Sequence, residues 1–330
     1  MINLKKIVFL IIVIFCNYLL ITSIVFTFSY LSLLKGKTYD WFWVKSIQKK
    51  IYFKGQRNIW QYENDCTTFD KDLFYKPRLG ECEFSNPEFN TILNFDDFIR
   101  INDLSSKNLE NNNSIIVLGD SIAMGWGVND NETFSYQLEK ISKRKVFNMG
   151  VSSYGTVREI KKLKLSPYYD NSKTIIIQYH INDLAENKEL DFKKVYLEKD
   201  FIKTFRDTSL KSSSIKFILG NFKSSIRLFF SDIIDIIFRD KNLELINFDI
   251  DKKYLEKVIK DNINLNEKNI IIFLPVQPWQ KVINFPKSYN QIKYVLIPLN
   301  KSQYFIIDDH PNKEGHFEIA KVLNNFLSTR

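Results

Sequence analysis

The feature that most constrains this chain is an apolar segment close to its N-terminus. No charged residue occurs from Ile7 to Leu34, and the stretch is longer than the roughly 20 apolar residues that a helix needs to span a bilayer. A cleaved signal peptide has a shorter apolar region followed by a small-residue cleavage site, and no Ala-x-Ala pattern follows this one. The segment therefore predicts an uncleaved transmembrane anchor over residues 1–34.

The charges around the anchor bear on its orientation. Lys5 and Lys6 precede the apolar segment and favour a cytoplasmic N-terminus. Lys35, Lys37 and Lys45 lie just beyond its other end and weaken this asymmetry. We expect a single-pass membrane protein whose larger part lies outside the cytoplasm, on the periplasmic side.

The chain has three cysteines and three histidines. Cys16 falls inside the apolar segment, whereas Cys66 and Cys82 lie in a polar stretch that would be outside the cytoplasm, where they could form a disulfide. No Cys-x-x-Cys pair or His–Cys cluster occurs. We therefore expect no metal site and no cofactor.

The net charge of +9 raises the question of a nucleic-acid partner. The lysines are spread along the chain between acidic residues and do not form one stripe with aromatic residues. We interpret the basic balance as a solvated surface, with contact to an anionic membrane surface or an acidic glycan as the alternatives. No nucleic-acid partner is expected.

The pattern of the chain changes near Asn111. Residues 35–110 are irregular, rich in aromatic and acidic residues and poor in long periodic runs, which is typical of a connecting and flanking region. From residue 111 to 330, short apolar runs alternate with segments of helical periodicity, as in a parallel sheet covered on both faces. We expect a doubly wound, mostly parallel α/β domain with a flavodoxin-like fold.

The elements of this domain are predicted from its apolar patterns. Strands are expected at residues 115–118, 145–150, 174–180 and 269–275, with a fifth at either 294–299 or 304–307. Helices are expected at 132–141, 156–165 and 313–327, the first with Phe134, Leu138 and Ile141 on one face.

Residues 186–268 form a long insertion between the third and fourth strands. Its middle, SIKFILGNFKSSIRLFFSDIIDIIF, carries apolar residues at helical spacing with lysines between them. We interpret it as helices packed on the sheet. A lid over the site or a helix on a membrane surface are the alternatives.

Polar residues follow the predicted strands at the edge where ligands bind. In open parallel sheets, ligands lie outside the carboxyl ends of the strands. These positions carry four polar clusters, which are Gly119-Asp120-Ser121, Asn148-Met149-Gly150-Val151-Ser152-Ser153, His180-Ile181-Asn182-Asp183 and, before the last helix, Asp308-Asp309-His310.

One combination of these residues suits nucleophilic catalysis. A serine hydroxyl is a weak nucleophile and needs a base within hydrogen-bond reach and a third group that orients the base. His310 with an adjacent carboxylate could supply both for Ser121. The negative charge that develops during acyl transfer needs hydrogen-bond donors, and Ser121, Ser153 and Asn182 are the candidates.

Four blocks of the sequence match, in order, those of one enzyme family. The blocks VLGDSIAMGWGV, NMGVSSYGT, YHINDL and DDHPNKEGHFEIA make the chain resemble an SGNH (GDSL-type) hydrolase from Ser114 to the C-terminus, apart from the insertion. The resemblance implies Ser121 as nucleophile, with its own backbone N–H in the oxyanion hole. It also implies Asn182 as a side-chain donor and His310 as the base. His316 matches a position that usually packs the last helix.

The chain departs from this family in three places. Ser153 stands where the family usually carries a glycine as oxyanion donor, which keeps the backbone N–H but puts the backbone angle in question. His180 stands where glycine is common. Ile307 occupies the position, three before the base, that often holds the acid. Asp308, two before the base, matches members that modify cell-surface polysaccharides, and we take it as the acid, with Asp309 in reserve.

The resemblance and the anchor lead to two classes of function. The first is a membrane-anchored serine esterase acting on an O-acylated cell-envelope glycan or lipid, or an O-acyltransferase of a surface polysaccharide. No companion multi-span acyltransferase domain accompanies the motifs, which favours the hydrolase. The second is a non-catalytic glycan-binding or envelope-assembly protein on the same scaffold, because a fold does not guarantee activity.

Overall fold

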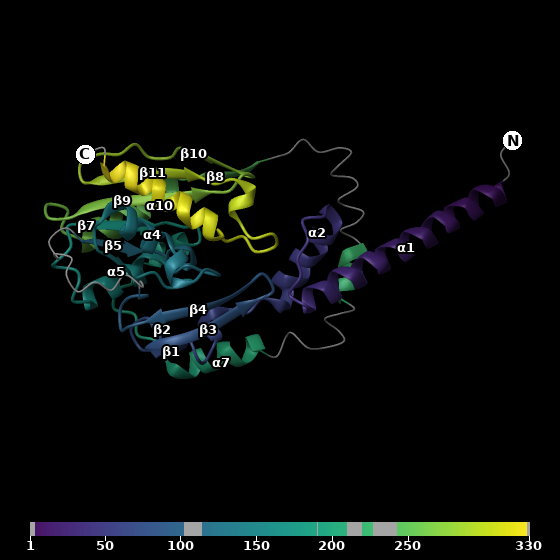
Figure 1. Cartoon of the computed structure of the whole chain (residues 1–330), viewed down its shortest axis with the longest axis horizontal. Coiled ribbons are helices and arrows are strands. Elements are labelled where there is room, and N and C mark those ends of the chain that lie inside the picture. Colours follow the sequence, from purple (N-terminus) through teal and green to yellow (C-terminus); the bar gives the residue numbers. More distant parts are fainter. Residues whose placement is uncertain (1–3, 102–113, 190, 210–219, 227–242, 329–330) are drawn as a thin grey trace.

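A five-stranded parallel sheet forms the centre of the molecule (Figure 1). The computed structural model describes residues 4–101, 114–189, 191–209, 220–226 and 243–328. In spatial order the strands are β6 (Val146–Asn148), β5 (Ile115–Leu118), β7 (Thr174–Gln178), β9 (Asn269–Val276) and β11 (Ile292–Pro298). In chain order this is 2-1-3-4-5, the flavodoxin-like arrangement of a doubly wound sheet. The predicted fold class is confirmed.

The strands are apolar because both faces of the sheet are covered. Every residue of β5, β6 and β7 is buried. Successive residues of a strand face opposite sides, so Ile115 contacts one layer of helices and Ile116 the other. The fifth strand is the first of the two predicted alternatives, and residues 304–307 do not form a strand.

Two pairs of helices cover the sheet. α4 (Phe134–Ser142) and α10 (Lys313–Ser328) pack on one face, and α5 (Thr156–Leu165) and α9 (Asp249–Asn262) pack on the other. Of the three residues expected on one helical face, Phe134 and Leu138 are fully buried, whereas Ile141 is 37% exposed. It lies in the last turn of α4, next to the chain reversal at Lys143.

Residues 35–101 form an ordered unit beside the sheet. They contain α2 (Phe42–Ile51), helical turns at Tyr52–Gln56 and Trp60–Tyr62, and two antiparallel hairpins, β1 (Thr67–Asp70) with β2 (Phe74–Pro77) and β3 (Gly80–Asn86) with β4 (Phe89–Phe95). Cys66 and Cys82 form a disulfide. The hairpins bury their apolar residues against Trp126 and Tyr154 of the sheet domain. The hairpins and the sheet domain build this core together. Because the strands are short, no long periodic run marks them in the sequence.

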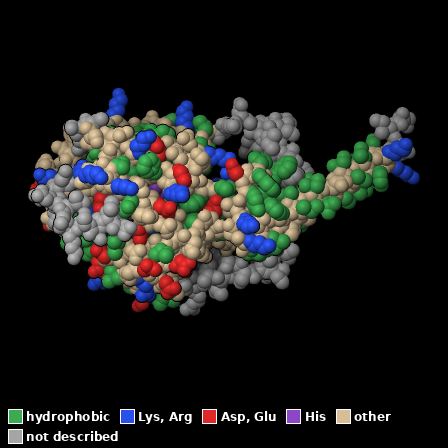
Figure 2. Space-filling model, viewed as in Figure 1, with side chains coloured by type: hydrophobic (Ala, Val, Ile, Leu, Met, Phe, Trp, Pro, Cys, Tyr) green, Lys and Arg blue, Asp and Glu red, His purple; other side chains and the backbone are tan. Residues whose placement is uncertain are grey.

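The apolar N-terminal segment is a single helix, α1 (Leu4–Leu34). Among the described residues it is the one helix long and apolar enough to cross a membrane, and its length and composition also fit a signal sequence. Its first half projects from the molecule and is exposed on all sides (Figures 1 and 2). Its second half packs against α2, where Phe26 and Leu33 join Ile47 and Ile51 in one apolar cluster.

The predicted insertion contains several separate elements. They are α6 (Asp183–Glu189), which enters it, α7 (Glu198–Ser209), a helical stretch at 220–226, and β8 (Glu244–Asn247), which pairs with β10 (Gln280–Ile283). The prediction of helices on the sheet holds for α9. It is wrong for α7, where Phe201 packs on Phe69 and Phe74 of the first hairpin. Most of the apolar run at 214–238 lies outside the described residues.

Candidate active site

A tight turn after β5 places Ser121 at the carboxyl edge of the sheet, as the first residue of α3 (Ser121–Met124). Gly119 has φ 147°, and a Cβ there would lie 2.6 Å from the Cβ of Ala123 and 2.7 Å from that of Gln178, so only glycine fits. The Gln178 side chain accepts hydrogen bonds from the backbone N–H groups of Asp120 (3.1 Å) and Ala123 (3.2 Å). Gln178 therefore ties the end of β7 to the turn that carries the serine.

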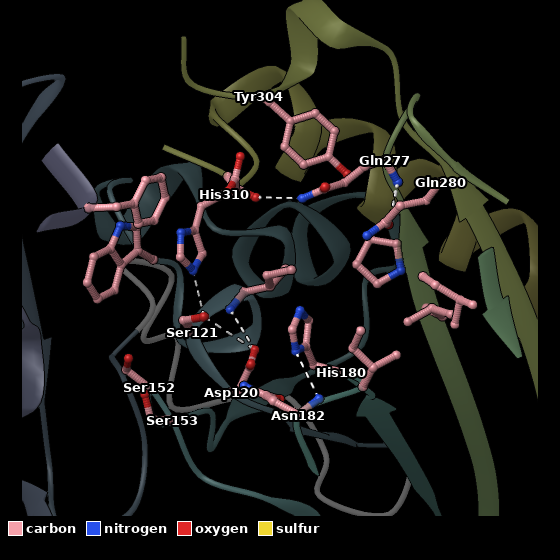
Figure 3. Close-up of a pocket in the computed structure, with 18 of the residues that line it drawn as sticks. Asp120, Ser121, Ser152, Ser153, His180, Asn182, Gln277, Gln280, Tyr304 and His310 are labelled. Atoms are coloured by element: carbon pink, nitrogen blue, oxygen red, sulfur yellow. Dashed lines mark hydrogen bonds between the residues drawn. The ribbon is translucent and has the colours of Figure 1, made fainter. Parts of the chain in front are cut away.

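His310 lies within hydrogen-bond reach of this serine. Oγ of Ser121 is 2.7 Å from Nε2 of His310 (Figure 3). The imidazole stacks on Trp126, with ring centroids 4.8 Å apart and planes 18° apart. Ser121 is 9% exposed and the His310 side chain 13%. The pair is thus held in one geometry and is shielded from most of the solvent.

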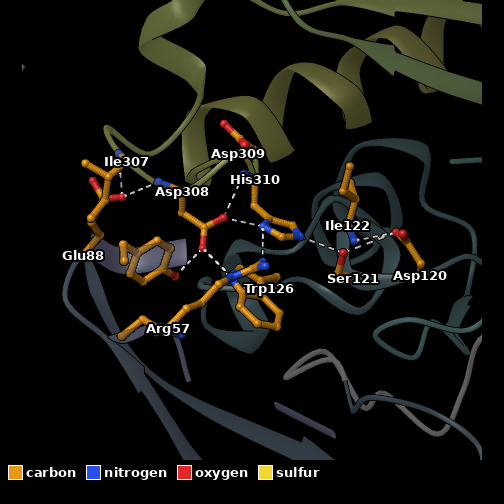
Figure 4. A network of polar contacts seen from close by, with 12 residues as sticks. Arg57, Glu88, Asp120, Ser121, Ile122, Trp126, Ile307, Asp308, Asp309 and His310 are labelled. Carbon is orange, nitrogen blue, oxygen red and sulfur yellow. Dashed lines mark hydrogen bonds and ion pairs between the residues drawn. The ribbon is translucent and has the colours of Figure 1, made fainter. Parts of the chain in front are cut away.

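The Asp308 carboxylate completes the arrangement (Figure 4). Its Oδ1 accepts a close hydrogen bond from Nδ1 of His310. Its Oδ2 accepts from the Tyr52 hydroxyl (2.5 Å) and from Nε1 of Trp126 (3.1 Å), and lies 3.5 Å from Nε of Arg57. Burial by itself would raise the pKa of Asp308, but His310, Arg57 and Tyr52 outweigh it and hold the pKa below its usual range. Asp308 is therefore an ionised, buried hydrogen-bond acceptor.

Asp309 faces elsewhere. Its carboxylate forms an ion pair of 2.6 Å with Lys49 of α2 and is 40% exposed. Its carbonyl oxygen accepts a hydrogen bond from the Gln277 side chain (3.1 Å). Of the two carboxylates considered from the sequence, the structure places Asp308 against His310 and turns Asp309 away. The chain bends at residues 306–310, and the backbone N–H of His310 donates to Oδ1 of Asp308 (3.1 Å).

Glu88 holds the loop that carries these residues. It lies at the turn between β3 and β4, and its carboxylate accepts hydrogen bonds from the backbone N–H groups of Ile306 (2.7 Å), Ile307 (2.9 Å) and Asp308 (2.8 Å). Burial raises the pKa of Glu88, while these three donors act in the opposite direction. A hairpin of the flanking region thus fixes the backbone at Asp308.

Ser153 adopts the backbone conformation for which glycine is usually selected. Its φ is 62°, in the left-handed region, which costs a non-glycine residue about 1–2 kcal/mol. The Gln61 side chain donates to Oγ of Ser153 (3.1 Å), and Arg158 donates to its carbonyl oxygen (2.5 Å). Ser153 therefore has the left-handed backbone angle although it is not a glycine.

A cavity of about 490 Å³ brings the predicted donors together. Ser121, Ser153, Asn182 and His310 all line it, and Asp308 lies behind His310. Within the described ranges, no hydrogen bond takes up the backbone N–H of Ser121 or Ser153. Asn182 is exposed, and its own backbone N–H donates to Nδ1 of His180 (3.3 Å). The rest of the wall combines aromatic, amide, aliphatic and charged side chains, including Phe53, Arg57, Glu244, Ile246, Gln277 and Trp279.

His316 lies in the core and away from the cavity. Its Nδ1 accepts a hydrogen bond from the backbone N–H of Phe134 (3.1 Å), and its ring stacks on the Phe134 ring. Burial lowers the pKa of His316 to about 3. It packs α10 against α4, as the resemblance implies. In the part of the chain that the structure describes, no group of three or more His, Cys, Asp or Glu side chains could hold a metal ion.

Several residues of the site carry no clear signal in the sequence. Gln178 is a polar residue at the end of an apolar strand, and this position could have marked it. Trp126 lies within the block that contains Ser121. Tyr52, Arg57 and Glu88 stand in the irregular flanking region, and only the folding of that region onto the sheet domain brings them to the site.

A doubly wound sheet thus carries a hydrogen-bonded Ser–His–Asp chain at its carboxyl edge, the arrangement that activates a serine hydroxyl as a nucleophile. No protein-family model matches the chain, and no curated protein matches it. Among solved structures, it is similar to a lipolytic protein of the G-D-S-L family from Desulfitobacterium hafniense, at 13% identity and a TM-score of 0.33, over 65% of this chain and 99% of that chain.

Two further solved structures are similar over 66% of this chain. One is a family two carbohydrate esterase from Cellvibrio japonicus, at 12% identity over 61% of its length with a TM-score of 0.34. The other is a salicylyl-acyltransferase from a tetracycline biosynthetic pathway, at 13% identity over 56% of its length with a TM-score of 0.27. The chain spans less than two thirds of either protein. At such identities and TM-scores, the likeness by itself decides nothing about activity.

Proposed function

We propose that this protein is a serine esterase that removes an acyl group from an O-acylated cell-envelope glycan or lipid. The observation that carries the proposal is the continuous chain of hydrogen bonds from Oγ of Ser121 through His310 to the buried Asp308 carboxylate. It ends in a cavity where the N–H groups of Ser121 and Ser153 have no acceptor among the described residues. The candidates for nucleophile, base, orienting acid and oxyanion donors therefore lie at one site, which supports the proposal.

The proposed reaction follows from these positions. Nε2 of His310 takes the proton of Ser121 while Oγ attacks the ester carbonyl, and Asp308 stabilises the imidazolium through Nδ1. The backbone N–H groups of Ser121 and Ser153 and the side-chain amide of Asn182 would hold the oxyanion. His310 then protonates the leaving alcohol. Water, deprotonated by His310, releases the acyl group as a carboxylic acid.

The same acyl-enzyme serves the second candidate, an O-acyltransferase, in which a sugar hydroxyl replaces water. The aromatic and amide side chains of the cavity wall, such as Trp279 and Gln277, are suited to bind a polar acceptor with apolar faces. The non-catalytic alternative would require the departures from the family pattern at Ser153 and Asp308 to disable the site. It loses support because Ser153 has a left-handed backbone and Asp308 contacts His310.

We further propose that α1 anchors the protein in a membrane, with the cavity on the periplasmic side. The exposed first half of α1 supports the anchor. Lys5 and Lys6 at its start support the orientation, as does the disulfide between Cys66 and Cys82, which fits an oxidising compartment.

A serine-directed fluorophosphonate tests the proposed chemistry on the full chain in detergent. We expect a covalent adduct at Ser121, found by peptide mapping, that disappears in Ser121→Ala and in His310→Ala. Ser302→Ala, a change at an exposed serine outside the cavity, should leave the labelling unchanged. A folded protein that is not labelled, or is labelled at another residue, contradicts the proposal.

A further inference from the structure

We infer that Tyr52 and Arg57, in the segment that follows the two N-terminal helices, are positioning residues that orient the Asp308 carboxylate toward His310. This inference rests on the proposed function, because it assigns these residues a part in the same Ser–His–Asp arrangement. It makes the flanking region a component of the active site.

The first observation is that the two carboxylate oxygens of Asp308 have different hydrogen-bond partners. Oδ1 faces His310 and accepts from both its ring and its backbone N–H (3.1 Å). Oδ2 is occupied by the Tyr52 hydroxyl, by Trp126 and by the nearby Arg57 guanidinium. The side chain is 0% exposed, so these groups replace water as its solvation shell. A carboxylate with both oxygens engaged cannot rotate away from the imidazole without losing charge-assisted hydrogen bonds.

The second observation is that Tyr52 is rigidly held. It directly follows α2 and is fully buried, together with Ile51. Both belong to an apolar cluster with Phe26 and Leu33 of α1 and with Ile307, the residue before Asp308. The cluster therefore packs against Tyr52 and against the loop that carries the acid. It fixes the distance between the phenol hydroxyl and the carboxylate.

The third observation concerns the charge of Arg57. Its guanidinium lies 4.5 Å from the Trp126 ring and 5.1 Å from the Phe53 ring. Its Nη2 is 3.4 Å from Nδ1 of His310. When Nδ1 donates to Asp308, both of these nitrogens carry hydrogens. Two donors then face each other, and the contact is not a hydrogen bond. Arg57 thus attracts Asp308 and opposes the positive charge that His310 acquires during the reaction.

Other charged and titratable groups also face this site. They are Asp309 and its partner Lys49 on α2, Asp120 beside Ser121, and Glu88 behind the loop. Asp309 and Lys49 form an ion pair and largely cancel each other. Among the described residues, Arg57 is therefore the cation that lies close to both Asp308 and His310 without a carboxylate partner other than Asp308.

The variants Tyr52→Phe, Arg57→Gln and Arg57→Lys test the inference in the full chain. Two matched controls come from the same part of the molecule. Tyr30→Phe changes a tyrosine that packs on the same apolar cluster, and Arg78→Gln changes an exposed arginine whose described contacts are with backbone carbonyls of residues 64 and 67. Thermal unfolding establishes that each variant is folded.

The first readout is kcat and KM, measured separately on a short-chain acyl ester. Tyr52→Phe should lower kcat/KM about tenfold, because a hydrogen bond to a charged group is lost. Arg57→Gln should lower kcat and leave KM nearly unchanged, because the Asp308 carboxylate loses an ion-pair partner. Arg57→Lys, which keeps the positive charge, should recover part of that loss. A loss confined to KM in Arg57→Gln would mean that Arg57 contacts the substrate and does not position Asp308, and would overturn the inference for this residue.

The second readout does not depend on activity. The proton shared between Nδ1 of His310 and Asp308 should give a low-field ¹H NMR resonance that is absent in His310→Ala. We expect Tyr52→Phe and Arg57→Gln to shift or broaden it and both controls to leave it in place. An unchanged resonance in Tyr52→Phe and Arg57→Gln overturns the positioning role. A resonance that responds as expected in a chain without esterase activity supports the positioning and contradicts the proposed function.

Discussion

In the proposed mechanism, Ser153 contributes its backbone N–H, which any residue supplies if its φ is near 62°. Ser153→Gly should therefore keep kcat/KM within about threefold, because glycine adopts this angle without strain. Ser153→Val should lower kcat/KM strongly and destabilise the fold, since a β-branched residue rarely has a positive φ. Steady-state kinetics and thermal unfolding of the two variants check this. Equal activity in both variants would contradict the assignment of Ser153 to the oxyanion hole.

The neighbouring residues Asp308 and Asp309 should respond differently to the same substitution. Asp308→Asn should lower kcat by about a thousandfold or more, because the imidazole loses the acceptor that sets its tautomer. Asp309→Asn should cost at most about 1 kcal/mol of stability and little activity, since its ion pair with Lys49 is partly exposed. Kinetics on both variants, with unfolding curves, measures the difference. A larger loss in Asp309→Asn would mean that the acid has been misassigned.

At the scale of the element, α10 is tied to α4 by a histidine that must stay neutral. Burial lowers the pKa of His316 to about 3, whereas an unfolded histidine titrates near 6.5. Between these values the unfolded chain binds a proton that the folded chain does not, so stability falls as the pH falls.

His316 should therefore destabilise the fold by about 1.4 kcal/mol per pH unit as the pH falls from about 6 to 4. Urea unfolding of wild type and His316→Gln at several pH values measures this slope. The variant should be less stable at pH 7 and should lose less stability on acidification. His180→Gln, at a half-buried histidine on the cavity wall, is the control. Parallel slopes in wild type and His316→Gln would contradict the assignment.

At the scale of the whole molecule, α1 has two parts with different surroundings. Residues 4–17 are exposed on all sides, whereas Phe26 and Leu33 pack on the cluster that supports Tyr52 and Ile307. The proposed anchor and the proposed active site are therefore connected through one apolar core. Removal of the whole helix would expose that core beside the loop of Asp308.

Two truncations separate these roles. A chain that begins at Tyr18 should leave the membrane fraction but keep most of its kcat/KM, because the packed half of α1 remains. A chain that begins at Lys35 should lose activity and stability, since burial of each large apolar side chain contributes about 1.5–3 kcal/mol. Membrane fractionation, ester hydrolysis and thermal unfolding of both chains test this. Full activity in the shorter chain would show that α1 serves only as an anchor.

The sequence by itself determined the α/β class, the parallel strands and the positions of the polar clusters along the chain. Buried strands such as 174–178 are continuous apolar runs, and the glycine at position 119 and the polar residues after each strand are local signals. It also indicated Ser121, His310 and the Asp308-Asp309 pair, and it indicated that Cys66 and Cys82 could pair.

Only the tertiary structure decided which carboxylate faces His310 and which side chains surround that carboxylate. Asp308 and Asp309 are adjacent and chemically alike, so the choice between them depends on the backbone course that Glu88 imposes on the loop. Tyr52 and Arg57 lie more than 250 residues before the acid in the chain, and no local pattern marks such a contact. Contacts between distant segments form only when both elements have packed on a common core, and that packing depends on shape and burial across the whole fold.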